Sequence, residues 1–386
     1  MKLKLLLPFA ILLMLLTVAV CTGSQLFLLL SVLILLIVAG AVIAVLWAAA
    51  TLEADGELSA ETVRRGEDAT LFLRMKHRGL IPIAPLLLEL SDPAGNRDRE
   101  IRLKNMPGRL QSFRLPIHAA HVGVFPVGLH ACTVEDLLGL VRKRVVLKQT
   151  FFEMLVLPQT FDVEPLTLAP GDPGSELMAR ATEDLNAPSD IRSYQQGDAM
   201  KKIHWKLSMR KGELMVRKFD EPILQDVLIL MDCSRPPSWG HPQAEADLRD
   251  ALLETAASVL TAQLSTDHQV RLPLLGSRPV DVVKSMGLPI ALDYLSRVDF
   301  SETDRFERVL SMESRRLRKV GCVVVVAARL NIPMVDIMTR MHRSGPNIRL
   351  YLVTFAPEDE SVLTLIARLK QSGLEVSYVT PELSAS

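Results

Sequence analysis

The sequence lacks a net charge. Across 386 residues, 44 Lys and Arg side chains balance 44 Asp and Glu side chains, and 49% of the residues are hydrophobic. A neutral chain with this hydrophobic content is neither a disordered tail nor a polycationic nucleic-acid binder. Its length predicts two or three globular units.

Cysteine is also scarce. The four cysteines lie far apart in the sequence and form no CxxC pair. This spacing excludes a dense disulfide framework and a CxxC zinc site, and it favours reduced thiols. His130 and Cys132 are expected to share one face of a strand, but they belong to no regular zinc-ligand spacing.

Common catalytic motifs are absent as well. The chain contains no Walker A sequence, dinucleotide fingerprint, HExxH or GxSxG motif. These motifs are the usual sequence marks of phosphate binding, cofactor binding, zinc hydrolysis and serine hydrolysis. No nucleophile and base stand out as a pair, so the sequence predicts a protein that is not an enzyme.

Charged residues are missing from one long stretch, between Lys4 and Glu53. Two apolar runs fill it, residues 5–22 and 26–50, and as helices they span about 27 Å and about 38 Å. Both lengths suit a hydrocarbon core of about 30 Å. Because only a tight turn fits between the runs, residues 1–50 are expected to form a transmembrane helical hairpin.

Basic residues set the expected orientation of this hairpin. Lys2 and Lys4 precede the first helix, Arg64 and Arg65 follow the second, and the turn contains no basic residue. The positive-inside rule then predicts a multi-pass protein of the inner (plasma) membrane whose soluble domains lie in the cytoplasm. The alternative is a cleaved lipoprotein signal ending before Cys21, although the residue before that cysteine is not small.

Residues 51–160 are expected to form a β-sandwich of immunoglobulin-like architecture. Apolar residues alternate with other residues over 69–75, 86–90, 113–117 and 127–131, which is the period of strands. Turn residues separate these stretches. About seven short strands over about a hundred residues are typical of such a sandwich.

Residues 226–386 show a different pattern, in which short apolar strands alternate with helices. Uninterrupted apolar strands between helices indicate a mostly parallel sheet covered on both faces, an α/β domain of Rossmann type. Residues 161–225 are interpreted as a linker with a basic motif. In such α/β folds, ligands bind at the carboxyl ends of the strands.

Asp232 and Ser234 directly follow the first strand of this sheet. An Asp-x-Ser sequence at that place resembles the start of the metal-ion-dependent adhesion site of the von Willebrand factor A fold, whose oxygen ligands suit Mg²⁺. Thr303 is placed to supply the distant threonine of that site. Because Pro236 and Ala328 stand where further oxygen donors belong, we expect an incomplete site with weak Mg²⁺ binding at most.

The stretch from Asp190 to Arg217 resembles the signature of a bacterial family called domain of unknown function 58 (DUF58). The matching positions are Arg192, Tyr194, Gly197, Asp198, Trp205, Lys206, Ser208, Arg210 and Arg217. The resemblance implies a membrane hairpin, a β-domain and a von Willebrand factor A-like domain. It also implies a MoxR-type AAA+ ATPase as a partner, and often a transglutaminase-like membrane protein.

A helix is expected over residues 199–210, between Asp198 as N-cap and Gly212. Its side chains Lys202, Lys206 and Arg210 recur at every fourth position and form a basic stripe. Three interpretations remain open for the stripe: a solvated face, pairing with nearby acids, or a docking site for an acidic partner or lipid head groups.

Trp205 lies on the same expected helix, and we expect its side chain in the core. One aromatic ring beside basic side chains is not a stacking platform for nucleic-acid bases. The chain as a whole is therefore predicted to be a non-enzymatic, membrane-anchored adaptor. The rivals are a metal-dependent enzyme centred on Asp232 and a sensor of anionic lipids or polyanions that uses helix 199–210.

Overall fold

The computed structural model divides into two compact units, Met1–Leu157 and Pro158–Ser386, and each is described by itself. The structure describes residues 2–77, 86–91, 99–103, 110–136, 139–146, 150–166, 190–195, 200, 203–218, 226–237, 242–266, 269–273, 280–282, 287–300 and 306–381.

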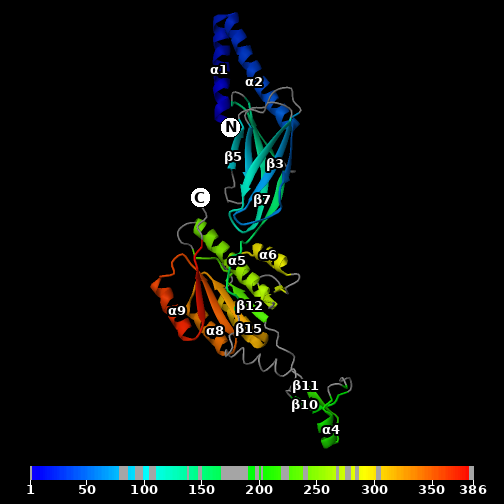
Figure 1. Cartoon of the computed structure of the whole chain (residues 1–386). Helices are drawn as coiled ribbons and strands as arrows, with labels where there is room; N and C mark the ends of the chain where they lie inside the picture. Colours follow the sequence, from blue (N-terminus) through cyan, green and yellow to red (C-terminus); the bar gives the residue numbers. More distant parts are fainter. Residues whose placement is uncertain are drawn as a thin grey trace. The chain divides into compact units, whose positions relative to one another are not determined.

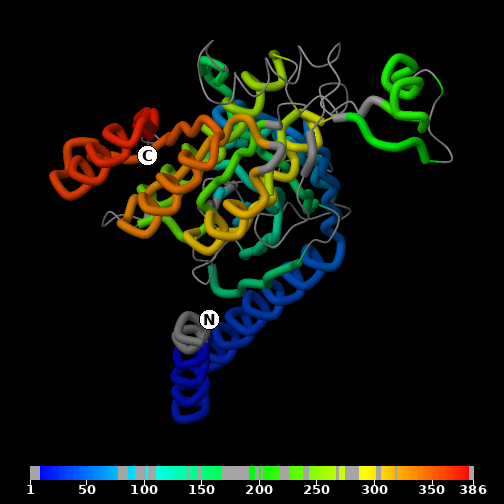
Figure 2. The backbone as a smooth tube through the Cα atoms, turned by 90° about the horizontal axis from the view of Figure 1, so that it is seen from below, coloured from blue at the N-terminus to red at the C-terminus, as the bar shows by residue number. Residues whose placement is uncertain are grey.

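The first unit begins with two helices, α1 (Lys2–Thr22) and α2 (Gln25–Thr51). They lie side by side in both views (Figures 1 and 2). Gly23 allows the short connection between them, because its φ of 64° is a left-handed conformation that other residues rarely adopt.

One helix in the described part of the chain, α2, is long and apolar enough to cross a membrane. Its most apolar 18-residue stretch has a mean hydropathy of 3.2, and only 6% of that stretch is buried. Most of α2 is therefore unlike the core helix of a soluble domain, which is mostly buried. The described apolar stretch of α1, Phe9–Thr22, is shorter. The length and composition of α2 are those of a membrane anchor or of a signal sequence.

The rest of the first unit is rich in strands. The structure describes β1 (Leu52–Leu58), β2 (Thr62–Arg64), β3 (Asp68–His77), β4 (Leu86–Ser91), β5 (Arg99–Leu103), β6 (Leu110–His118), β7 (Gly123–Glu135), β8 (Arg142–Val146) and β9 (Phe151–Leu157). One sheet has the order β1-β3-β6, and the other has the order β2-β9-β7-β4-β5 with β8 also paired to β7. The strands predicted from alternation correspond to β3, β4, β6 and β7.

Both sheets contribute to one apolar core. In β3, Leu71, Leu73 and Met75 are fully buried, whereas Arg74 between them is exposed, as the two-residue period of a strand requires. Leu86 and its alternate neighbours in β4 enter the same core from the other sheet. The alternation of apolar residues therefore determines which face of each strand is buried.

The second unit contains an α/β domain. Its strands are β12 (Asp226–Met231), β13 (Gln269–Leu272), β14 (Val280–Val282), β15 (Val320–Ala327), β16 (Asn347–Val353) and β17 (Glu375–Val379). Its helices are α5 (Pro242–Ser265), α6 (Leu288–Ser296), α7 (Phe306–Glu313), α8 (Ile332–Arg343) and α9 (Glu360–Gln371), with a 3₁₀ helix over Ser314–Lys319. Figure 1 shows helices packed around this sheet.

The sheet has the order β14-β13-β12-β15-β16-β17. All neighbouring strands run parallel except β14, which is antiparallel to β13. The apolar run of β15 lies at the centre and is buried on both faces, as expected for a covered parallel sheet. The sequence pattern predicts neither the short strand β14 nor helix α6. It predicts one helix over residues 304–318, where the described residues form α7 followed by the 3₁₀ helix.

The first residues of the second unit pack against this domain. The Phe161 N–H donates to Ser258 Oγ of α5 at 2.9 Å, and Arg349 Nη1 donates to the Glu164 carbonyl at 3.3 Å. Leu166 is buried. Residues 161–166, which were expected in a linker, therefore form part of the packed domain.

Candidate functional site

The carboxyl ends of β12 and β15 bring together the residues of the predicted metal site. The last residue of β12 pairs with Val326 of β15. The Asp232 N–H continues this ladder by donating to the Val326 carbonyl at 2.8 Å. Asp232 is thereby held at the edge of the sheet, only 2% exposed.

The Asp232 carboxylate is engaged by Ser234, two residues later. Its Oδ1 accepts a hydrogen bond from the Ser234 N–H at 3.0 Å and a second one from the Ser234 hydroxyl. This is the geometry of an Asx turn, which the Asp-x-Ser spacing favours. Both side chains are buried.

Arg329, two residues beyond β15, completes the cluster. Its Nε lies 3.4 Å from Asp232 Oδ2, and its Nη2 donates to Ser234 Oγ. The Arg329 side chain is 45% exposed, whereas the Asp232 side chain is 3% exposed. A cationic side chain of the chain itself therefore lies against the two oxygen-bearing side chains of the incomplete site that the sequence predicts.

This arrangement does not fit a metal site. Ser234 Oγ already donates to Asp232 and accepts from Arg329, and both carboxylate oxygens have partners. A hard cation needs lone pairs that are free to point at it. Thr303, the third predicted ligand, lies outside the described residues.

Burial raises the pKa of the Asp232 carboxyl above its usual value of 3.8. The two hydrogen bonds from Ser234 and the charge of Arg329 act in the opposite direction, and the charge of Glu307 adds to the increase. Desolvation is the largest of these effects. The carboxyl thus holds its proton to a higher pH than an exposed aspartate does.

The family motif forms a second cluster, built on a small hairpin. Strand β10 (Asp190–Ser193) pairs antiparallel with β11 (Met215–Lys218), and helix α4 (Trp205–Lys211) lies between them in the chain. Ser208 joins the helix to the hairpin, because its hydroxyl accepts from the Met215 N–H at 2.8 Å and donates to the His204 carbonyl at 3.0 Å. Ser208 and Met215 are both buried.

The helix is shorter than predicted. Ile203 forms a β-bridge with Val216 and is 5% exposed, so the chain is extended there and α4 begins at Trp205. The N-cap is His204, whose Nδ1 accepts from the Leu207 N–H at 3.2 Å. Burial of Ile203 against β11 therefore prevails over the local helical pattern at this position.

Two of the three residues of the predicted basic stripe lie on α4. Lys206 and Arg210 lie four residues apart on α4 and are exposed, and neither pairs with a described acidic side chain. Lys202 precedes the helix and lies outside the described residues, as do Gly197 and Asp198. Gly212 does end the helix as predicted, with a φ of 71°.

Trp205 corrects another expectation. It was expected in the core, but it is 59% exposed, and Met209, one turn along the same face, is 85% exposed. The positions that fill the small core are instead Ile203, Met215 and Val216. No local sequence pattern distinguishes these positions from Trp205, because their burial depends on the pairing of Ile203 with Val216.

The remaining motif residues belong to the hairpin. The Tyr194 N–H donates to the Leu214 carbonyl at 2.8 Å, and Arg192 Nη1 donates to the Ser193 carbonyl at 3.3 Å. Arg217 pairs with Ile191 across the two strands. The Tyr194 hydrogen bond and the Arg217 pairing are backbone contacts that join the two sides of the hairpin.

His130 and Cys132 do not share a strand face. The pairing of β4 with β7 shifts between Glu89 and Leu90, and His130 is the extra residue of the bulge. His130 is consequently exposed while Cys132 is fully buried. Burial, together with the charge of Glu89, raises the pKa of the Cys132 thiol to about 12, so this thiol is not a ready zinc ligand.

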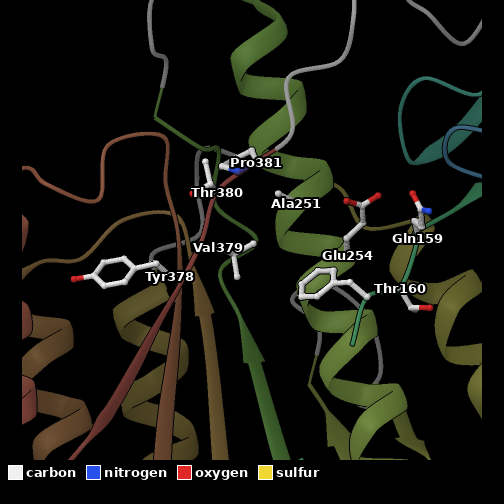
Figure 3. Close-up of a pocket in the computed structure, with 9 residues that line it drawn as sticks. Gln159, Thr160, Ala251, Glu254, Tyr378, Val379, Thr380 and Pro381 are labelled. Atoms are coloured by element: carbon white, nitrogen blue, oxygen red, sulfur yellow. The ribbon is translucent and has the colours of Figure 1, made fainter. Parts of the chain in front are cut away.

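A pocket of about 450 Å³ opens beside the carboxyl end of β17 (Figure 3). It is lined by Gln159, Thr160, Phe161, Ala251, Glu254, Tyr378, Val379, Thr380 and Pro381. Glu254 of α5 carries the only charge among these lining residues. No histidine, cysteine or lysine is among these described lining residues.

Three solved structures share limited similarity with the chain. The CARDB domain of a Pyrococcus furiosus protein is 12% identical, covering 28% of this chain and 94% of its own, with a TM-score of 0.20. A cohesin module of a Clostridium perfringens glycoside hydrolase is 10% identical, covering 28% and 96%, with a TM-score of 0.21. Sporulation control protein Spo0M of Bacillus subtilis is 16% identical, covering 38% and 58%, with a TM-score of 0.18. TM-scores of this size do not establish a shared fold.

No curated protein matches the chain. A family model does match, over a range that contains both clusters described above, the hairpin with α4 and the Asp232–Arg329 pair. Residues 190–335 match the family described as "Protein of unknown function DUF58".

Proposed function

We propose that the chain is a membrane-anchored, non-enzymatic adaptor that binds other proteins. Its proposed partner is a MoxR-type AAA+ ATPase, with a transglutaminase-like membrane protein as a further partner; both come from the family resemblance. The role is the assembly or remodelling of a protein complex at the membrane. The matched family is described as having unknown function. The support for a protein-binding role therefore comes from the surface of this chain.

The observation that carries the proposal is the exposure of Trp205 and Met209 on α4. Large apolar side chains that lie side by side on a surface mark interaction sites more often than scattered ones do. Trp is also among the residues that contribute most binding energy at protein interfaces. These two lie inside the segment that matches the family model.

The Asp232 cluster argues against the rival metal-dependent enzyme. A catalytic metal needs an open coordination position and oxygen donors aimed at it. Here Arg329 pairs with Asp232 and donates to Ser234. The cluster joins the ends of β12 and β15, and we assign it a structural role.

For the membrane segment we propose a hairpin in which α1 and α2 both cross the inner membrane. It is supported by the apolar composition of both helices and by the basic residues outside them. The soluble domains would then lie in the cytoplasm. We also propose that the strand-rich domain is immunoglobulin-like and that the α/β domain is of the von Willebrand factor A type.

Crosslinking in native membranes, followed by purification of the tagged chain and mass spectrometry, tests the proposal. We expect an AAA+ ATPase to be recovered with the wild-type chain. The metal content of the same preparation should lie far below one equivalent per chain. A chain whose residues 1–43 are deleted is the control, because it should lose the enrichment that depends on the membrane anchor.

Two results contradict the proposal. Recovery of no AAA+ ATPase from crosslinked membranes removes the proposed partner. A stoichiometric divalent metal that is lost in Asp232→Ala restores the metal-dependent enzyme as the better interpretation.

A further inference from the structure

One face of α4 combines apolar and basic side chains. Trp205 and Met209 are one turn apart, and Lys206 and Arg210 follow them at the next positions, so two apolar and two basic side chains form adjacent rows. All four are exposed. We call these four residues the α4 face.

Hydrogen bonds hold α4, and with it the α4 face, against the hairpin. Ser208, on the same helix, is buried and hydrogen-bonded to β11 and to His204. The Gly212 N–H donates to the Ser208 carbonyl at 2.9 Å and closes the end of the helix. A helix held in this way presents its exposed side chains in a preformed arrangement, which lowers the entropy lost when a partner binds.

The charge of α4 indicates the chemistry of the partner that binds the α4 face. Helix α4 contains no acidic residue, and its last turn adds Lys211 to Arg210. A second copy of the same face would bring like charges together, which disfavours self-association through this face. An acidic segment offers the opposite charge and, with an apolar side chain of its own, covers Trp205.

The size of the helix favours a protein over a membrane surface. Helix α4 has seven residues, about 10 Å in length. Helices that lie in the membrane interface bury a long apolar face along their whole length. Two exposed apolar side chains with a basic rim match the pattern of a protein interface, with an aromatic anchor surrounded by charged residues.

We propose that the α4 face binds an acidic, amphipathic segment of a partner protein, with Trp205 and Met209 as apolar anchors and Lys206 and Arg210 pairing with its carboxylates. This inference rests on the proposed adaptor function and adds the chemistry of the partner. The inference concerns the chemistry of the bound segment and does not depend on which protein contains that segment.

The test uses the fluorescence of Trp205 in the full-length chain. The chain has three tryptophans, so Trp47→Phe and Trp239→Phe leave Trp205 as the only indole. The protein is held in phosphatidylcholine nanodiscs and titrated with a synthetic amphipathic helical peptide of leucine and glutamate. We expect a saturable blue shift of the Trp205 emission, and none with the same peptide carrying lysine for glutamate.

Charge reversal on the face supplies the specific variant. In the same background, Lys206→Glu with Arg210→Glu should weaken binding of the acidic peptide about tenfold or more, while the melting temperature stays the same. The matched control is Arg343→Glu with Lys370→Glu on α8 and α9, which makes the same change in charge at exposed positions elsewhere. The control should bind as the unmodified chain does.

Three results overturn the inference. The first is an unchanged Trp205 emission with the acidic peptide, or an equal response to both peptides. The second is a blue shift with phosphatidylglycerol vesicles and none with the acidic peptide, which would make the face a lipid site. The third is a drop in melting temperature on charge reversal, which would show that the basic side chains pair within the chain.

Failure of this inference is distinguishable from failure of the proposed function. If the peptide does not bind but crosslinking still recovers the ATPase, the adaptor function stands and its surface lies elsewhere. If the peptide binds but crosslinking recovers no ATPase, the α4 face is a binding site and the assigned partner is wrong.

Discussion

Asp232 is a buried carboxyl whose two oxygens are both engaged by the chain itself. Ser234 donates twice to Oδ1, and Arg329 lies against Oδ2. Even so, desolvation raises its pKa above 3.8. The native state therefore binds the proton more tightly than the unfolded chain, and this contribution to stability is fully present below pH 3.8 and lost as the pH rises through the folded pKa.

The first prediction compares two substitutions at this residue. Asp232→Asn mimics the protonated carboxyl and keeps an acceptor for Ser234, so at neutral pH the free energy of unfolding should equal or exceed that of the wild type. Asp232→Ala leaves buried donors without an acceptor and should cost about 1–3 kcal/mol. Hydrogen exchange of the β12 amides in increasing urea measures both values.

Lowering the pH supplies the control for this prediction. Below about pH 3 the wild-type carboxyl is protonated in both states, so any difference between wild type and Asp232→Asn should disappear. If Asp232→Asn is as unstable as Asp232→Ala at neutral pH, the ionised carboxylate is needed and the inferred dominance of desolvation is wrong.

Trp205 and Ser208 lie three residues apart on α4 and differ in burial. We predict that Trp205→Ala changes stability by less than about 0.5 kcal/mol, because the side chain is exposed. Ser208→Ala should cost about 1–3 kcal/mol by leaving the buried Met215 N–H without its acceptor. Hydrogen exchange of β11 distinguishes the two variants, and a large loss in Trp205→Ala would show that this ring is buried.

At the scale of elements, β7 shows how one glycine fixes the pairing of a long strand. Gly128 has a φ of 142°, and a Cβ added there would lie 2.0 Å from the Thr150 carbonyl oxygen. That oxygen accepts from the Leu129 N–H at 3.0 Å, and the Thr150 hydroxyl donates back to the Leu129 carbonyl at 2.8 Å. Strand β7 pairs with β9 up to this point and with β8 beyond the bulge at His130.

We therefore predict that Gly128→Ala destabilises the first unit by about 3 kcal/mol or more, since the strained φ adds to a clash with backbone atoms. Gly66→Ala is the matched control. Gly66 also has a positive φ, 83°, but nothing lies within 4 Å of an added Cβ, so only strain of about 1 kcal/mol remains. Thermal unfolding of the two variants should differ by several degrees, and equal melting temperatures would contradict the clash.

Elements were predictable from the sequence where local pattern and tertiary packing agree. The apolar run Cys322–Val326 is both a strand pattern and the buried centre of the sheet, and β15 was predicted within two residues at its start. Ile203 is the opposite case. The periodicity around it favours a helix, but Ile203 pairs with Val216 of β11, and a contact between residues this far apart is not visible in a local stretch of sequence.

The candidate site was predictable to a similar extent. The position of Asp232 and Ser234 directly after β12 was predictable from the sequence pattern of the strands. This position drew attention to them, because ligands of such folds bind at the carboxyl ends of the strands. The pairing with Arg329 did not, because it depends on β12 and β15 being neighbours although 95 residues separate Ser234 from Arg329. A second acidic side chain beside Asp232 would favour a metal site, whereas the basic side chain of Arg329 forms an ion pair with it.

At the scale of the whole chain, helix α2 has two different surroundings. Most of its side chains are exposed, but Val45 and Ala48 near its end are buried in the core of the strand-rich domain together with Leu52. The last turns of the apolar helix are therefore part of the folded domain. The apolar helix and the domain share these residues, so a fragment that keeps the complete core should begin before Val45.

The last prediction follows from this shared segment. The full chain should sediment with membranes, and fragments 44–386 and 52–386 should not. Removing Val45 and Ala48 from the core costs about 2–3 kcal/mol by lost burial, so the first unit of fragment 52–386 should melt several degrees below that of fragment 44–386. In the full chain, Val45→Ala should lower the melting temperature, whereas Leu46→Ala, at a neighbouring exposed position, should leave it unchanged. Equal melting of the two fragments would mean that α2 does not contribute to the core, and a soluble full-length chain would exclude the anchor.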